Sequence, residues 1–88
     1  MKKHILVVDD EYDLCEILRF NLEIEGYEVD VAFSGEEALT YELSKYSLVL
    51  LDVMMENLSG FEVAKMLRAD EKTSFLPIIF FIRIEKSC

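Results

Sequence analysis

The sequence predicts one doubly wound α/β domain built on a parallel β-sheet. Short apolar runs rich in β-branched residues alternate along the chain with amphipathic segments of helical period. Successive apolar runs are separated by roughly 20 to 30 residues, which suits right-handed crossovers between parallel strands. A chain of 88 residues is too short to supply two hydrophobic cores. We therefore expect a single domain with the element order βαβαβαβ.

The first strand is expected at residues 4–8, HILVV, which form a continuous apolar run of the kind found in strands covered on both faces. A helix is expected over residues 11–25, because Leu14, Ile17, Leu18 and Leu22 recur at helical spacing between charged residues. Gly26 would end this helix. Residues 27–32, YEVDVA, alternate apolar and acidic side chains and predict an edge strand.

The middle of the chain predicts a second helix and a third strand. Ser34 and Glu37 have the spacing of a capping box, so a helix is expected from Ser34 to about Ser44. Its inward residues would be Ala38, Leu39 and Leu43. Residues 47–51 are mostly apolar and predict a buried strand.

Residues 59–82 predict one more helix and one more strand. Ser59 and Glu62 repeat the capping-box spacing, and a helix is expected over residues 60–69. Residues 77–82, PIIFFI, form an apolar strand with proline at the first position, where it is tolerated.

Composition excludes several classes of partner. The formal net charge of −9 repels nucleic-acid phosphates and anionic lipid headgroups. No apolar run approaches the roughly 20 residues needed to cross a bilayer, and the N-terminus lacks a signal-type segment. The two cysteines, Cys15 and Cys88, have no metal-type spacing and indicate free thiols. These observations favour a cytoplasmic protein that binds neither nucleic acid nor membrane.

Carboxylates follow two of the predicted strands. Asp9, Asp10 and Glu11 come after the first strand, and Asp52 comes after the third. Ligand sites of open α/β sheets lie at the carboxyl ends of the strands, at the topological switch point, where successive connections leave in opposite directions. A 2-1-3-4 strand order places this point between strands one and three. Clustered carboxylates repel unless a cation lies among them. Oxygen ligands alone favour Mg²⁺, with Mn²⁺ as an alternative, over zinc.

Simpler roles exist for these residues. An acidic run before a helix is often an N-cap with acids favoured by the helix dipole, and a single aspartate after a strand is often a turn residue. Capping explains either Asp9 or Asp10. It does not explain both of them together with Asp52, so a metal-assisted phosphoryl-transfer site is the sharper hypothesis.

The chain resembles the receiver domain of two-component response regulators. The resemblance is carried by ILVVDDE at 5–11, LLDVMM at 50–55, SGFEVAKMLR at 59–68 and LPIIFF at 76–81. It implies a flavodoxin-like (CheY-like) doubly wound fold, here incomplete, with strand order 2-1-3-4 and three helices. It also implies a signalling domain that is not an enzyme.

The same resemblance implies the roles of individual residues. Asp52 would be the phosphoacceptor, and Asp9, Asp10, Asp52 and the backbone carbonyl of Met54 would bind Mg²⁺. The phosphoryl donor would be a sensor histidine kinase, and the partner would be an output or effector domain that this chain does not contain.

The chain departs from the family pattern at several places. Glu56 stands where the family usually has proline, and Ile82 stands at the switch position, which usually carries a hydroxyl. Residues 1–88 would form a partial receiver without the last strand and the last two helices, and without the family's lysine, whose place Lys86 cannot take. The final IRIEKSC does not resemble the family. The sequence thus suggests a truncated or frame-shifted receiver with impaired phosphorylation.

Two rival functions and one physical consequence follow. A degenerate receiver would act only as a protein-interaction module. An aspartate-nucleophile phosphohydrolase would need a second acid where Met54 stands. If the chain stops at Cys88, the strand at residues 77–82 becomes an apolar edge, and we expect self-association through that strand or the uncovered sheet face.

Overall fold

The computed structural model describes residues 2–82 and contains a four-stranded parallel sheet. The strand order is β2-β1-β3-β4, which confirms the predicted 2-1-3-4 order. All three neighbouring pairs are parallel. The strands are β1 (His4–Val8), β2 (Glu28–Ala32), β3 (Leu48–Asp52) and β4 (Ile78–Phe81).

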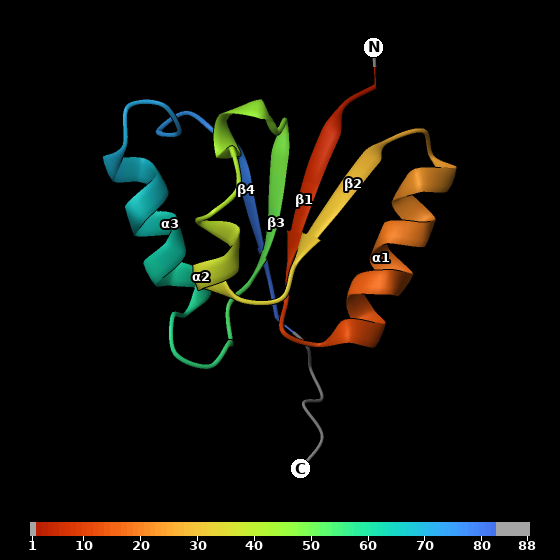
Figure 1. The fold of residues 1–88 in the computed structure, drawn as a ribbon, viewed down its shortest axis with the longest axis horizontal. Helices are drawn as coiled ribbons and strands as arrows, with labels where there is room; N and C mark the ends of the chain where they lie inside the picture. Colours follow the sequence, from red (N-terminus) through yellow and green to blue (C-terminus); the bar gives the residue numbers. More distant parts are fainter. Residues whose placement is uncertain (1, 83–88) are drawn as a thin grey trace.

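Helices cover both faces of the sheet, as Figure 1 shows: α1 lies on one side, and α2 and α3 lie on the other. This is the doubly wound arrangement that right-handed crossovers produce. The helices are α1 (Tyr12–Ile24), α2 (Gly35–Ala38) and α3 (Gly60–Ala69), and a 3₁₀ turn, η1 (Leu43–Lys45), precedes β3. Among the described residues, none of the helices is both long and apolar enough to cross a membrane.

Each face of the sheet has its own hydrophobic cluster. On the α1 side, Cys15 of the helix is fully buried against Ile5, Val7 and Val29 of the strands. The cluster on the α2 and α3 side is larger, because alternate residues of β1 and β3 meet both helices and the loop before β4. Its buried members are Leu6, Val8, Ala32, Ala38, Leu43, Tyr46, Val49, Leu51, Val63, Leu67 and Leu76.

The helix expected from Ser34 to about Ser44 is much shorter than predicted, since α2 ends at Ala38. The Thr40 hydroxyl donates to the Glu37 carbonyl (2.6 Å), and the Thr40 and Tyr41 amides bond to residues three positions back, which tightens and ends the helix. The Tyr41 hydroxyl donates to Val31 O of β2 (2.7 Å), so the chain leaves the helical path to reach the sheet.

The two predicted capping boxes have different outcomes. At α3 the box is complete: the Ser59 hydroxyl accepts from the Glu62 amide, and the Glu62 carboxylate accepts from the Ser59 amide. At α2 the Ser34 hydroxyl accepts from the Glu37 amide (2.9 Å), but the Glu37 carboxylate accepts from the amide of Phe33 instead. Only the α3 box therefore has both reciprocal bonds of the motif.

Several predicted inward residues are exposed. Ile17 is 57% exposed, because the buried face of α1 is centred on Cys15 with Leu18 and Leu22 beside it. Leu39 lies at the end of the shortened α2 and is 36% exposed. The other boundaries differ from prediction by at most one residue, and β1 and α3 have the bounds expected for them.

Candidate functional site

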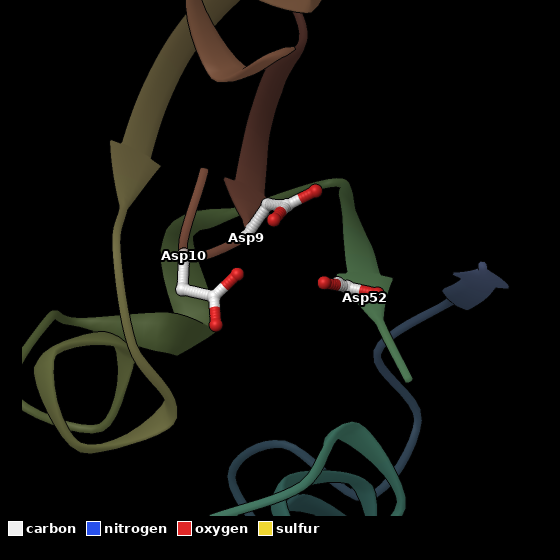
Figure 2. A group of neighbouring side chains, drawn as sticks. All are labelled: Asp9, Asp10 and Asp52. Carbon is white, nitrogen blue, oxygen red and sulfur yellow. The ribbon is translucent and has the colours of Figure 1, made fainter. Parts of the chain in front are cut away.

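Three aspartates meet where β1 and β3 end side by side. Val8 of β1 pairs with Leu51 of β3, so Asp9 and Asp10 leave β1 next to Asp52. The sequence predicts Asp52 directly after the third strand, whereas in the structure Asp52 is the last residue of β3. One carboxylate oxygen from each aspartate lies within 4.8 Å of the others. Figure 2 shows the three carboxylates around a common space. The predicted cluster is therefore present at the switch point of the sheet.

The three carboxylates differ in burial. Asp9 and Asp52 are completely buried, whereas Asp10 is exposed. Asp10 thus forms the side of the cluster that a ligand from solvent reaches first. Burial of two ionised carboxylates is costly unless hydrogen bonds or a cation compensate for it.

Backbone amides hold two of the carboxylates in place. The Met54 amide donates to Asp52 Oδ1 (3.1 Å), and the Glu11 amide donates to Asp9 Oδ1 (3.0 Å). Each aspartate therefore bonds to the amide two residues later, in the manner of an Asx turn. These bonds fix the rotation of each carboxylate about its side-chain torsions.

The structure also tests the simpler capping interpretation of Asp9 and Asp10. The N-cap residue of α1 is Glu11, and its side chain makes no capping hydrogen bond. Asp9 bonds to the amide of this N-cap residue and not to an amide of the first turn. Helix capping therefore does not account for the acidic run at this position.

Close backbone packing positions the end of β3. Gly60, the first residue of α3, donates its amide to Val53 O (3.1 Å), and Val53 donates its amide to Phe81 O of β4 (3.0 Å). A β-carbon on Gly60 would overlap the backbone oxygen of Asp52 and would lie 3.0 Å from the Val53 α-carbon. Only a residue without a side chain permits this approach. In the sequence Ser59-Gly60 indicates only a helix start, and no local pattern reveals this positional role of Gly60.

The loop after β3 carries two of the other residues singled out from the sequence, Met54 and Glu56. Met54 is 52% exposed and Glu56 is exposed, while Asn57 adopts a left-handed conformation with φ of 64°. Asn tolerates this conformation better than most residues do. Ile82, at the predicted switch position, directly follows β4 and is 56% exposed. Lys86 lies outside the described residues.

Cys15 lies directly beneath the cluster and is the other chemically distinctive group near it. Its thiol donates to the backbone oxygen of Asp9 (3.3 Å). Burial, followed by the nearby charges of Asp9 and Glu16, raises the pKa of Cys15 to about 12. It therefore remains a neutral thiol near neutral pH and acts as a packing residue of the α1 side.

The donor set fits a hard divalent cation. All three side chains offer oxygen, and Mg²⁺ uses carboxylates with water in place of nitrogen or sulfur ligands. A cation among the three carboxylates would also remove their mutual repulsion. The residues present thus fit the Mg²⁺ site that the sequence predicts here.

Comparison with known proteins agrees with the fold and the site. The family model described as the response regulator receiver domain matches residues 5–86. The chain is 52% identical over 69 residues to the alkaline phosphatase synthesis transcriptional regulatory protein PhoP of Bacillus subtilis, covering 77% of this chain and 29% of that protein. It is 48% identical over 88 residues to the probable transcriptional regulator ycf27 of Porphyra purpurea, covering 99% of this chain and 35% of that protein.

Solved structures give the same result. The response regulator protein TrrA of Thermotoga maritima, solved in complex with Mg²⁺ and BeF, has a TM-score of 0.83 and 47% identity, over 91% of this chain and 69% of that one. The chemotaxis protein CheY4 of Vibrio cholerae has a TM-score of 0.85 and 31% identity, over 91% and 68%.

The chain thus spans about a third of the length of these curated relatives and about two thirds of these solved chains. The family model nevertheless covers nearly all of the sequence, and the strand order and the three α-helices within residues 2–82 are those expected for this part of a receiver. This chain belongs to the response regulator receiver domain family.

Proposed function

We propose that this chain is a phosphoacceptor domain in which Asp52 accepts a phosphoryl group from a phosphohistidine of a sensor histidine kinase. The observation that carries this proposal is the meeting of the Asp9, Asp10 and Asp52 carboxylates within 4.8 Å at the carboxyl ends of β1 and β3. In the transfer, an oxygen of Asp52 forms a bond to phosphorus while the bond between phosphorus and the histidine nitrogen breaks. The histidine nitrogen keeps that electron pair.

The chain's own residues orient the nucleophile. The Met54 amide bonds to Asp52 Oδ1 (3.1 Å) and so fixes the plane of the carboxylate. Gly60 allows α3 to press against the backbone of Asp52, which holds the end of β3 rigidly against the loop. Such positioning is worth more in phosphoryl transfer than covalent assistance, because the transition state is loose.

The metal ligands that we propose are the carboxylates of Asp9, Asp10 and Asp52 and the backbone carbonyl of Met54. Mg²⁺ bound there would neutralise charge on the transferred phosphoryl group. Mg²⁺ is the ion present in the related structure from Thermotoga maritima, which supports it as the cofactor for this chain. We propose a cytoplasmic location and an effector module outside this chain as the recipient of the signal.

A phosphorylation assay tests the proposal. The chain is incubated with Mg²⁺ and a small-molecule phosphodonor, and the mass increase of one phosphoryl group is followed over time. We expect an acid-stable, base-labile adduct that is absent from Asp52→Asn. Asp70→Asn is the matched control, since Asp70 is exposed at the far end of α3, and it should label like the wild type. An adduct that persists in Asp52→Asn would contradict the proposal.

A second function, a receiver that is not phosphorylated and serves as a protein-interaction module, is favoured by one observation. Ile82 is 56% exposed beside the end of β4 and has no hydroxyl to bond a phosphoryl oxygen. Absence of any adduct, with the fold intact by circular dichroism, would support this function. Repeated turnover of a phosphoester would instead show an enzyme, which we do not propose.

A further inference from the structure

Helix α2 is in close contact with the start of α3, and a glycine makes this contact possible. Figure 1 shows the two helices on the same face of the sheet. Gly35, the first residue of α2, is buried. A β-carbon on Gly35 would lie 2.7 Å from Cγ2 of Val63 and 3.2 Å from both Cβ and Cδ2 of Leu58. Two side chains at the start of α3 therefore leave no room for a methyl group at position 35.

Space, and not backbone conformation, accounts for a glycine at this position. Gly26 has a positive φ, whereas Gly35 does not. Alanine would therefore suit the backbone of Gly35, and it has the higher helix propensity. What excludes even this small side chain is the close approach of α2 to α3.

The two side chains that face Gly35 cannot move away easily. Val63 is 1% exposed, and a valine in a helix strongly prefers one χ1 rotamer, so its methyl groups are fixed relative to α3. The Cβ atom of Leu58 is bonded directly to the backbone, so it moves only when the chain moves. A larger residue at position 35 would therefore displace the start of α3 itself.

The segment that would be displaced is the one that rests on Asp52. The two side chains that face Gly35 are at the N′ and N4 positions of α3, the two positions of a hydrophobic staple, which fixes how the chain enters a helix. Between them, Gly60 donates its amide to Val53 O (3.1 Å) and packs against the backbone of Asp52. Contacts thus run without a gap from Gly35 through the start of α3 to the end of β3.

We propose that Gly35 is a positioning residue for Asp52, and so for phosphoryl transfer, and that it acts through the start of α3. The link to phosphoryl transfer rests on the proposed function of Asp52. Gly35 leaves room for α3 to lie close to β3, where Gly60 contacts Asp52. Phosphoryl transfer depends on the placement of the attacking oxygen, and a misplacement of about 1 Å can slow a reaction by about a hundredfold.

Gly35→Ala is the main variant, and the phosphodonor assay is the first measurement. The labelling rate per folded molecule should fall by about tenfold, because the added methyl group displaces the start of α3 and with it the end of β3. Leu43→Ala is the matched control, since Leu43 belongs to the same hydrophobic cluster but lies before the amino end of β3. This variant should also lose stability, yet its folded molecules should label like the wild type.

A second substitution separates positioning from a general loss of stability. Val63→Ala removes the methyl group nearest to Gly35, so α3 has room again in the double variant that carries Gly35→Ala and Val63→Ala. The double variant should recover most of the wild-type labelling rate. Its unfolding temperature should stay below that of the wild type, because two buried methyl groups are lost and only one is added. A merely structural role would change labelling and stability together.

Two measurements without a phosphodonor separate this inference from the proposed function. The amide NMR signals of Val53 and Met54 report on the end of β3, so they should move in Gly35→Ala and return towards their wild-type positions in the double variant. The Mg²⁺ dissociation constant, measured by titration calorimetry, should rise several-fold in Gly35→Ala, since Asp52 is a proposed ligand. If the wild type is not labelled but both changes occur, the proposed function fails and the positioning of Asp52 by Gly35 is supported.

Folded Gly35→Ala that labels like the wild type, with unmoved Val53 and Met54 signals, would overturn the proposal. A double variant that labels as slowly as Gly35→Ala would also overturn it. Circular dichroism confirms that each variant is folded. If Gly35→Ala does not fold, Leu58→Ala takes its place: it removes a side chain that rests on Gly35, so labelling should slow, and an unchanged rate would count against the proposal.

Discussion

Gly60 and the phosphoacceptor candidate Asp52 are in direct backbone contact: a β-carbon on Gly60 would overlap the carbonyl oxygen of Asp52. The start of α3 thus rests on the last residue of β3. Because backbone atoms form this contact, neither side can relax by a change of rotamer. The position of the proposed nucleophile therefore depends on a residue that has no chemistry of its own.

We predict that Gly60→Ala destabilises the domain by about 1 to 3 kcal/mol, since the added methyl group must displace backbone. It should also slow labelling of Asp52 by displacing the end of β3. Urea denaturation and the phosphodonor assay measure the two effects. Gly26→Ala is the control: Gly26 has φ of 99° but nothing within 4 Å, so it should cost stability without changing the labelling of folded protein. Equal labelling by Gly60→Ala and wild type would contradict this role.

We predict that Mg²⁺ raises the thermal unfolding temperature of the wild type. A ligand that binds only the folded state adds about 2.7 kcal/mol at a hundredfold excess over its dissociation constant. Asp10→Asn removes one of the three clustered carboxylates, so it should unfold at a higher temperature than the wild type without Mg²⁺ and gain less when Mg²⁺ is added. Differential scanning fluorimetry with and without Mg²⁺ measures both shifts. An Asp10→Asn protein with an undiminished Mg²⁺ response would show that the ion binds elsewhere.

The sequence was sufficient to predict the sheet order and the meeting of the three aspartates. Apolar runs of strand length identify β1, β3 and β4, and the resemblance to receiver domains implies the 2-1-3-4 order in which they lie. Asp9, Asp10 and Asp52 then follow as a cluster, since carboxyl ends of adjacent parallel strands share one edge.

Features that depend on tertiary contacts were not predictable. The early end of α2 results from the Tyr41 hydroxyl, which bonds to Val31 of a strand ten residues earlier. Helical periodicity carries no information on such a bond. The exposure of Ile17 depends on which side of α1 meets the sheet, and that side carries Cys15, Leu18 and Leu22. The contact of Gly60 with Asp52 requires the packing of α3 on β3, which no local pattern reveals.

We predict that Cys15 makes stability fall with rising pH from about pH 9. Its folded pKa of about 12 lies above the ordinary value of 9.0, so the contribution is complete below pH 9 and is lost as the pH rises towards 12. Urea denaturation at pH 8, 9 and 10 should show this decline in a Cys88→Ser background. Cys15→Ala in the same background should flatten it. A decline of equal slope in both proteins would assign the titration to another group.

Asp30 of β2 contacts side chains from two other segments, His4 of β1 and Tyr46 before β3. Replacing Tyr46 by Phe removes one of these contacts with little change in side-chain shape. Asp30 Oδ2 accepts from the Tyr46 hydroxyl (2.7 Å) and lies 2.9 Å from His4 Nε2. Tyr46 is 5% exposed, and burial, together with its hydrogen bond to Asp30, raises its pKa above the ordinary value. The Tyr46 hydroxyl therefore stays protonated near neutral pH and donates its hydrogen bond to Asp30.

We predict that Tyr46→Phe costs about 1 to 2 kcal/mol in the free energy of unfolding, because it removes a hydrogen bond to a charged acceptor that is itself partly solvated. Urea denaturation near neutral pH measures the loss. Tyr12→Phe is the matched control, since Tyr12 is 62% exposed and stacks on Phe33, and it should change stability by less than about 0.5 kcal/mol. Similar losses in the two variants would show that the Asp30 bond contributes nothing specific. Labelling of Asp52 should be unchanged in folded Tyr46→Phe, because Tyr46 precedes β3 whereas Asp52 ends it.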